Sequence, residues 1–283
     1  MAAEMQAAWR CRNAECASCR RVEREAYMVH FVGAGPGAVD LITVRGQKLI
    51  EKADVIVYAG SLVNPQLLEY AKDGAEIHDS ARLTLEEVID IMSGACQKGL
   101  EVVRLHTGDP SLYGAIREQM DELDKLEIDY DVTPGVSSFC GAAAALNMEY
   151  TLPGITQSVI ISRMEGRTKV PESESVEKLA HIGATMVFFL SAGDIKGLKD
   201  RLLDAGRSPH TLCAVVYKAT WEDEKKFICE LDELPDMAAE HGINKTALII
   251  VGDAVGQSGY EKSRLYAADF DTEFRKSKKW NEG

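Results

Sequence analysis

Three glycine-rich turns in the first half of the chain carry the polar side chains best placed to do chemistry. They cover residues 33–38, which include Pro36, residues 106–114, which include Asp109, and residues 133–145. Each turn directly follows a short β-rich run. Because ligands bind outside the carboxyl ends of the strands in open α/β sheets, we expect the three turns to share one crevice.

The first turn matches the dinucleotide-binding fingerprint Gly-x-Gly-x-x-Gly/Ala in Gly33-Ala-Gly-Pro-Gly-Ala38. Pro36 removes a backbone N–H from the middle of this turn, and the next helix is expected to begin only at Thr43. The second strand has its acidic residue, Asp54, at its start, whereas a ribose-binding acid belongs at its end. A nicotinamide-nucleotide site and a glycine-rich turn without a ligand both stay open as alternatives.

The second turn contains a carboxylate, in Gly108-Asp109-Pro110. Such a turn at a strand end presents backbone N–H and C=O groups and one carboxylate to a crevice, which suits a cationic or polyhydroxyl ligand. The alternative is an Asp-Pro turn that caps a helix starting at Ser111. The buried face of that helix would consist of Leu112, Ile116, Met120 and Leu123.

The third turn has two hydroxyls, on Ser137 and Ser138, at the start of an alanine-rich helix that runs to Ala145. Serine is a common helix N-cap, and a run of alanines lets a helix pack closely on a neighbour or on a flat ligand.

Positive charge gathers in the second half of the chain, at Arg163, Arg167 and Lys169, beside the end of an expected strand. Several arginines on one short segment suit a ligand with several carboxylates. The alternative is a solvated loop.

The whole chain of 283 residues has 45 acidic and 32 basic residues, a formal net charge of −13 and 46% hydrophobic residues. This composition is typical of a globular protein and excludes disordered, collagen-like and small disulfide-bonded classes. The acidic balance argues against nucleic-acid and membrane-surface partners. No apolar run approaches the about 18 residues of a membrane span, and the N-terminus lacks a secretory signal, so we expect a cytoplasmic protein.

Four segments are expected along the chain: an N-terminal extension at 1–27, an α/β lobe at 28–150, a second α/β lobe at 151–253 and a tail at 254–283. The extension contains Cys11-x4-Cys16-x2-Cys19, which could give three thiolates to zinc or an iron–sulfur cluster. A closed zinc site needs a fourth ligand. We therefore assign no metal site and expect a poorly ordered extension.

Alternating strand and helix patterns predict a mostly parallel sheet in the first lobe and a mixed sheet in the second. A capping box, Thr84 with Glu87, predicts the start of one helix. A hairpin is expected around Trp221 to Glu224. The expected strands are 28–32, 54–58, 101–105, 129–133, 157–162, 185–190, 211–217, 226–230 and 246–251.

Taken in order, these residues resemble the tetrapyrrole (corrin and porphyrin) methylase family, whose members use S-adenosylmethionine. The resemblance covers residues 28–252. Its motifs are Val32-Gly-Ala-Gly-Pro-Gly37, Asp40-Leu-Ile-Thr43, Ala53-Asp-Val-Ile-Val-Tyr58, Gly108-Asp-Pro110 with Tyr113-Gly114, and Pro134-Gly-Val-Ser-Ser138. Three further segments resemble the branch that methylates precorrin-4 or its cobalt form at C(11): Tyr58-Ala-Gly-Ser-Leu-Val63, His106-Thr-Gly-Asp-Pro110 and Arg163-Met-Glu-Gly-Arg-Thr168.

The resemblance implies a two-lobed α/β fold, a homodimer, and a cofactor folded into the cleft between the lobes. The implied S-adenosylmethionine-binding residues are Pro36, Thr107, Gly108, Asp109, Leu112, Ser137, Ser138, Leu190, Ala219 and Ala247. The implied tetrapyrrole-binding residues are Arg163 and Arg167, which would hold the acetate and propionate arms, and Tyr113. No catalytic residue is assigned, because alignment of the sulfonium with the substrate carbon requires no nucleophilic side chain.

Other functions stay open at this point. A related methylase could act on precorrin-2, precorrin-3 or uroporphyrinogen III. A nicotinamide-dependent oxidoreductase would use the turn at 33–38, and a non-catalytic metal-binding module would use the three N-terminal cysteines.

Overall fold

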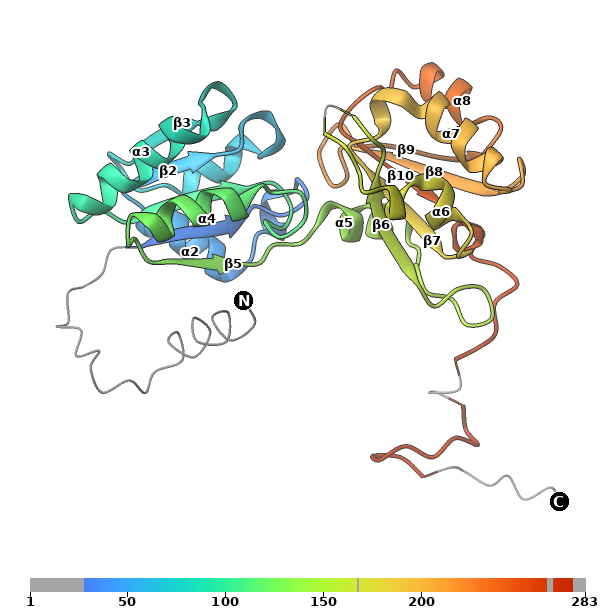
Figure 1. The fold of residues 1–283 in the computed structure, drawn as a ribbon. Coiled ribbons are helices and arrows are strands. Elements are labelled where there is room, and N and C mark those ends of the chain that lie inside the picture. The colour runs from blue at the N-terminus through green and yellow to red at the C-terminus, as the bar shows by residue number, and fades with distance from the viewer. Residues whose placement is uncertain (1–27, 167, 264–266, 277–283) are drawn as a thin grey trace, which may run out of the picture.

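The computed structural model describes residues 28–166, 168–263 and 267–276. They form two α/β lobes, each built on a five-stranded sheet (Figure 1). Among these residues, no helix is long and apolar enough to cross a membrane. The extension with its three cysteines lies outside the described residues.

The first lobe has a wholly parallel sheet with the strand order β3-β2-β4-β1-β5. The central strand β4 is buried along its whole length, as is expected for a strand with neighbours on both sides and helices on both faces. The strands are β1 (Val29–Gly33), β2 (Val55–Tyr58), β3 (Glu76–Asp79), β4 (Val102–His106) and β5 (Tyr130–Thr133).

Helices cover both faces of this sheet. Helices α3 (Leu85–Gln97) and α4 (Ile116–Lys125) share one core with the sheet, and α2 (Val44–Lys52) shares the core on the opposite face. The capping box at the start of α3 is present, since Thr84 accepts from Glu87 N–H and the Glu87 carboxylate accepts from Thr84 N–H.

The second lobe has a mixed sheet with the order β6-β7-β10-β8-β9, in which only β6 and β7 run parallel. Three helices pack on one face of it around a core that includes Phe188 and Leu198. The strands are β6 (Val159–Arg163), β7 (Thr185–Phe189), β8 (Leu212–Tyr217), β9 (Lys225–Glu230) and β10 (Ala247–Val251), and the helices are α6 (Val176–Ala180), α7 (Ile195–Asp204) and α8 (Leu234–Glu240).

The other face of this sheet is covered by α5 (Ser138–Leu146), whose Ala142 packs with Val187, Ala214 and Leu248. The chain therefore crosses between the lobes before α5 and not at residue 150, where the first lobe was expected to end (Figure 1). Small alanine side chains allow this helix to lie close to the sheet.

Nine strands agree with the sequence-based expectation to within two residues at each end, and β3 was missed. The helix expected from Ser111 begins instead at Ile116. Tyr113 and Ala115 adopt the left-handed backbone conformation, with φ of 58° and 50°, which interrupts a helix between Ser111 and Ile116.

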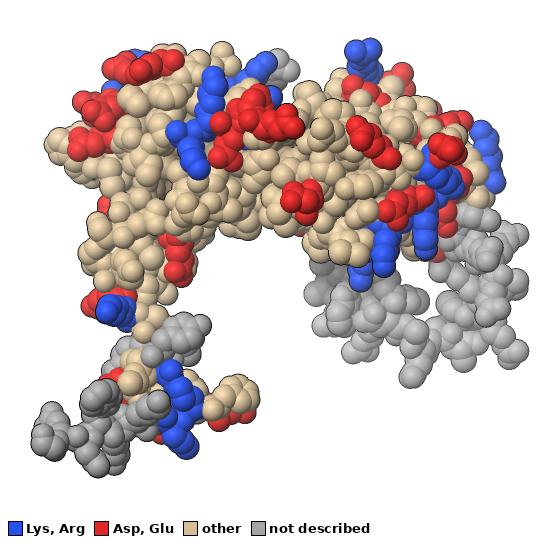
Figure 2. Space-filling model, turned by 180° about the vertical axis from the view of Figure 1, so that it is seen from behind, with Lys and Arg blue, Asp and Glu red and all other residues tan. Residues whose placement is uncertain are grey.

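On the face in Figure 2, basic and acidic side chains are interspersed over both lobes.

Candidate active site

The three glycine-rich turns meet through their backbones at the carboxyl edge of the first sheet. Gly35 and Gly108 exchange two hydrogen bonds, with N···O distances of 3.2 and 2.9 Å. Ala34 N–H also donates to the carbonyl of His106 at 2.7 Å. The expectation that these turns are neighbours is thus met by direct pairing.

Glycine is required at this junction because backbone atoms lie where a side chain would begin. A Cβ on Gly33 would lie 2.5 Å from Gly135 N and 2.7 Å from Gly108 O. A Cβ on Gly135 would collide with the carbonyl oxygen of Gly108. The glycines of the first turn therefore allow close approach of the other turns, a role that needs no nucleotide phosphate.

The carboxylate of Asp109 connects the second and third turns. Its Oδ1 accepts from Ser111 N–H at 2.9 Å and from the Ser111 hydroxyl, and its Oδ2 accepts from Gly135 N–H at 3.0 Å. The alternative of an Asp-Pro turn that caps a helix from Ser111 is wrong in its helix, which begins at Ile116, although Asp109 does bind Ser111 N–H. The carboxylate also fixes a turn 26 residues away.

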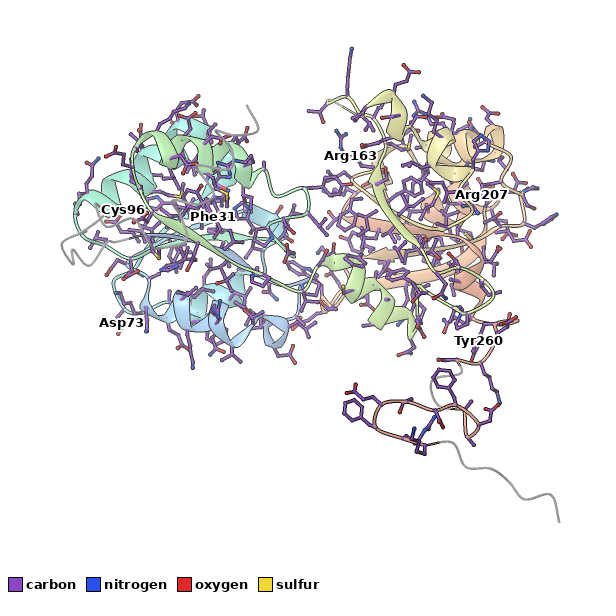
Figure 3. All side chains as sticks on the ribbon, turned by 60° about the horizontal axis from the view of Figure 1, so that its bottom comes forward. Phe31, Asp73, Cys96, Arg163, Arg207 and Tyr260 are labelled. Atoms are coloured by element: carbon purple, nitrogen blue, oxygen red, sulfur yellow. The ribbon has the colours of Figure 1, made fainter. Side chains whose placement is uncertain are left out.

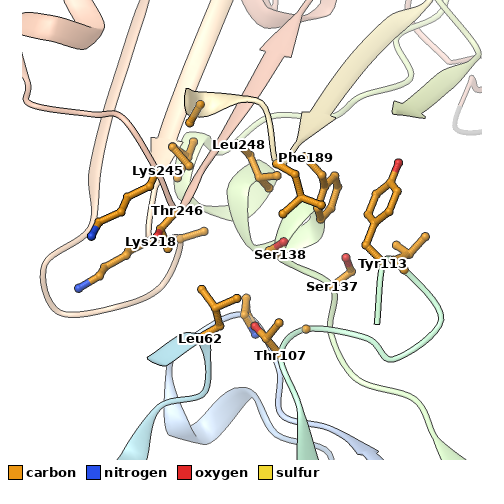
Figure 4. A pocket seen from close by; sticks show the side chains of 18 of the residues that line it. Leu62, Thr107, Tyr113, Ser137, Ser138, Phe189, Lys218, Lys245, Thr246 and Leu248 are labelled. Atoms are coloured by element: carbon orange, nitrogen blue, oxygen red, sulfur yellow. The ribbon is translucent and has the colours of Figure 1, made fainter. Parts of the chain in front are cut away.

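A cavity of about 470 Å³ lies between the two lobes, above this junction (Figure 4). All ten residues that the sequence nominated for cofactor binding line it, and Tyr113 lines it too. The residues that sequence reasoning did not nominate include Leu62, Phe189, Trp221, Lys245 and Thr246.

Helix α5 begins at this cavity with Ser137 and Ser138. The N-cap hydroxyl of Ser137 makes no capping hydrogen bond. The N–H groups of the first helical turn have no intrahelical partners, and the positive end of the helix dipole favours electronegative ligand atoms there.

Four cavity residues other than glycine adopt left-handed backbone conformations: Tyr113, Leu190, Lys218 and Thr246, with φ between 46° and 58°. Such conformations are uncommon for residues with a Cβ and gather at functional sites, where the surrounding structure stabilises them. Leu190 is also 73% exposed, although it is a large apolar residue. Because this combination is typical of functional sites, the cavity is the candidate active site.

The lobes are joined at the cavity by the loop between β8 and β9. Trp221 Nε1 donates to the carbonyl of Pro36 at 3.1 Å, and the hydroxyl of Thr220 accepts from Ala38 N–H at 2.9 Å. A Cβ on Gly37 would overlap the Trp221 ring. The first turn thus contacts the second lobe as well as the neighbouring turns.

Two positively charged side chains, Lys218 and Lys245, lie at the end of the cavity formed by this loop (Figure 4). Lys218 Nζ lies 2.6 Å from the Asp223 carboxylate, and this hydrogen bond raises the pKa of Lys218. Tyr113 lies at the other side of the cavity, where its ring centroid is 5.3 Å from that of Phe189. Burial raises the pKa of Tyr113.

A second cavity, of about 580 Å³, shares Tyr113 with the first. It is lined by β6 residues, among them Arg163, and by Pro171, Glu174 and Leu179. Arg163 and Tyr113 therefore border one space, whereas Arg167 lies outside the described residues.

His106 does not line either cavity and is 4% exposed. Burial, assisted by the charge of Arg104, lowers the pKa of His106 to about 3, so its ring is neutral at pH 7. Among the described residues, no group of three or more His, Cys, Asp or Glu side chains could hold a metal ion.

Comparison with known proteins gives a consistent result. A family profile described as "Tetrapyrrole (Corrin/Porphyrin) Methylases" matches residues 28–235. A cobalt-precorrin-4 C(11)-methyltransferase from Methanocaldococcus jannaschii is 51% identical over 89% of this chain and 97% of the relative. A precorrin-4 C(11)-methyltransferase from Mycobacterium tuberculosis is 43% identical over 84% of this chain and 96% of the relative.

Solved structures share the fold. The X-ray structure of a cobalt precorrin-4 methyltransferase is 44% identical, with a TM-score of 0.80 over 83% of this chain and 99% of the other. A uroporphyrin-III C-methyl transferase from Thermus thermophilus, solved with S-adenosylhomocysteine, is 25% identical, with a TM-score of 0.69 over 82% of this chain and 100% of the other. With these matches over most of its length, the chain belongs to the tetrapyrrole (corrin/porphyrin) methylase family.

Proposed function

We propose that this chain transfers a methyl group from S-adenosylmethionine to C(11) of precorrin-4 or of its cobalt form, in the biosynthesis of cobalamin. The observation that carries the proposal is the cavity of about 470 Å³ between the lobes, which all ten nominated cofactor residues line. Relatives that are 51% and 43% identical bear the names cobalt-precorrin-4 C(11)-methyltransferase and precorrin-4 C(11)-methyltransferase.

The cavity suits S-adenosylmethionine in size and in chemistry. Its volume of about 470 Å³ is within the usual range for sites that enclose a small molecule. Leu112, Phe189 and Leu248 form an apolar wall against which the adenine base of the cofactor can pack. The hydroxyls of Ser137 and Ser138 can form hydrogen bonds with polar atoms of the cofactor. The cradle of phosphate-binding N–H groups that a dinucleotide needs is interrupted by Pro36.

The bound cofactor supplies a methyl group on a sulfonium, which is already an excellent leaving group. The protein has to hold the electron-rich substrate carbon in line with the S–CH3 bond and to keep water away. Such alignment supplies roughly 7–11 kcal/mol of the barrier reduction. The backbone junction of Gly33, Gly108 and Gly135 makes one wall rigid, and the loop at Trp221 fixes the opposite lobe against it.

The substrate is proposed to reach the cofactor from the side of Tyr113, where the second cavity begins. Arg163 borders this cavity, and a corrin precursor carries acetate and propionate arms that an arginine can bind. Arg167 stays a proposed carboxylate-binding residue on the resemblance alone.

A homodimer in the cytoplasm is also proposed, on the resemblance and on the composition. Light scattering coupled to size-exclusion chromatography measures the mass in solution, and a monomer at micromolar concentration would contradict the dimer.

The reaction is tested by anaerobic incubation of the protein with labelled S-adenosylmethionine and either precorrin-4 or cobalt-precorrin-4. Mass spectrometry and carbon NMR should find one added methyl at C(11), and the faster substrate identifies the natural form. A methyl at another carbon would support a related methylase. Saturable NAD(H) binding without S-adenosylhomocysteine binding would support an oxidoreductase.

A further inference from the structure

Arg163, at the end of β6, makes unusual contacts for a residue nominated to bind carboxylates. Its guanidinium donates to three backbone carbonyls, those of Met164 and Thr168 at 3.1 Å and that of Lys169 at 3.0 Å. These acceptors lie on the segment that directly follows Arg163. Arg163 itself lies on the side of the second lobe that faces the first (Figure 3). The side chain of Arg163 thus forms hydrogen bonds with both ends of the loop 164–169.

This loop has few other contacts among the described residues. Gly166 N–H donates to the Thr168 carbonyl at 3.3 Å, and Glu165 lies 3.9 Å from Arg201, a long and exposed ion pair. The start of the loop is fixed more firmly, because Met164 is 7% exposed and its N–H donates to the Ser191 hydroxyl at 2.9 Å. Among the described residues beyond Met164, Thr168 and Lys169 are both bound by Arg163.

The loop is coupled to both cavities. Arg163 and Val170, on either side of it, line the second cavity together with Tyr113. Ser191, which holds Met164, also donates to the Phe189 carbonyl at 2.7 Å, and Phe189 contacts Tyr113 in the wall of the first cavity. The loop is therefore connected, through these contacts, to the surface where substrate and cofactor would meet.

We propose that Arg163 is a positioning residue, which holds the two ends of the loop 164–169 together in the arrangement that admits the corrin substrate to the second cavity. The role depends on the planar guanidinium as a fork of donors and not on its charge alone. The inference rests on the proposed function, since it names what the substrate side of that site requires.

Two substitutions separate the fork from the charge. Arg163→Lys keeps the charge and loses the fork, whereas Arg163→Gln loses both. We expect both variants to raise KM for the corrin substrate about tenfold or more, while kcat and the Kd of S-adenosylhomocysteine change less than about threefold. If Arg163→Lys kept the KM of the wild-type enzyme, charge alone would suffice and the proposal would be overturned.

Limited proteolysis of the full chain gives a readout that is independent of activity. A protease binds its cleavage site as an extended segment, so we expect release of Lys169 from Arg163 to speed tryptic cleavage of the Lys169–Val170 bond. In both Arg163 variants this cleavage, followed by mass spectrometry, should be about fivefold or more faster than in the wild type. The matched control is Glu165→Gln, which removes only the long ion pair to Arg201 and should leave the cleavage rate unchanged.

The two measurements distinguish the possible failures. A wild-type enzyme that methylates neither precorrin-4 form would contradict the proposed function. The proteolysis would still measure whether Arg163 holds the loop. Normal cleavage and normal KM in Arg163→Gln, with an active wild type, would overturn the role of Arg163 and leave the proposed function intact.

Discussion

The carboxylate of Asp109 accepts a hydrogen bond from the backbone N–H of Gly135 at 3.0 Å, and thereby joins two turns that follow different strands. The same carboxylate accepts two hydrogen bonds from Ser111. Of these three residues, Asp109 lines the cavity between the lobes. We therefore expect Asp109 to support the proposed cofactor site through the positions of these turns as well as through its charge.

Replacing Asp109 by alanine should weaken S-adenosylhomocysteine binding about tenfold or more and lower the free energy of unfolding by about 1.5–3 kcal/mol, because N–H groups lose a charged acceptor. Calorimetry and urea unfolding measure the two effects. The control Asp200→Ala removes an exposed carboxylate paired with Lys196 on α7 and should change stability by less than about 0.5 kcal/mol. Equal behaviour of the two variants would contradict the role of Asp109.

Adding one methyl group at Gly135 should abolish cofactor binding, because its Cβ would occupy the place of the Gly108 carbonyl and lie 2.8 Å from Gly33 Cα. The matched control is Gly94→Ala in α3, where a Cβ meets nothing within 4 Å. That change should stabilise the protein by about 0.5–1 kcal/mol, since alanine is the better helix former. Calorimetry with S-adenosylhomocysteine and urea unfolding compare the variants; tight binding by Gly135→Ala would show that the junction tolerates displacement.

Much of the fold could be predicted because local signals agree with it. The Thr84–Glu87 capping box begins α3, and the apolar run Ala247–Val251 is the buried strand β10. Strand β3 was missed because Glu76-Ile-His-Asp79 is an edge strand with a single apolar residue, which is 44% exposed. An edge strand with so little burial leaves no hydrophobic pattern to detect.

The site was predictable where residues follow one another on the chain, and not where distant segments meet. The three turns can be recognised from their glycines and from their position after expected strands. The contact of Trp221 with Pro36 joins residues that are 185 positions apart, and nothing in the local sequence indicates it. Likewise, the sequence shows that Arg163 is a cation but not that three carbonyls hold it.

The contacts between the lobes should contribute directly to cofactor affinity. Thr220→Val keeps the shape of the side chain but leaves Ala38 N–H without its acceptor, and Trp221→Phe removes the donor to Pro36. Each should weaken S-adenosylhomocysteine binding about 3- to 10-fold, as expected for a lost hydrogen bond of about 1 kcal/mol. Thr220→Ser keeps the hydroxyl and should bind nearly as tightly as the wild type. Unchanged affinity in both Thr220→Val and Trp221→Phe would mean that these two hydrogen bonds between the lobes do not contribute to cofactor binding.

A buried cation stabilises the first lobe through neutral partners. Arg104 is 6% exposed, and its guanidinium donates to Gln119 Oε1 at 2.9 Å and to the Val57 carbonyl at 3.1 Å. Burial lowers the pKa of Arg104 to about 10, so it is still charged at pH 7. Arg104→Ala should cost about 2–4 kcal/mol, whereas the double change Arg104→Met with Gln119→Leu should cost less, because no buried polar side chain is left without a partner. A double-mutant cycle from urea unfolding measures the coupling, and additive effects would contradict it.

His106 should make stability depend on pH. Its folded pKa of about 3 lies below the unfolded value of about 6.5, because burial and Arg104 disfavour the charged ring. The unfolded chain therefore takes up a proton first as pH falls. The stability due to the neutral ring is present above pH 6.5 and is lost progressively down to about pH 3, by up to about 1.4 kcal/mol per pH unit.

The measurement is urea unfolding of the wild type and His106→Leu at pH 7.5, 6.0 and 5.0, with the variant expected to lose stability less steeply. His210 is the control of opposite sign, since its hydrogen bond to Glu230 raises its pKa. A raised pKa stabilises the fold at acid pH and loses that effect as pH rises, so His210→Asn should weaken the fold more at pH 5.0 than at pH 7.5. Parallel curves for the wild type and His106→Leu would mean that His106 takes up its proton without unfolding the lobe.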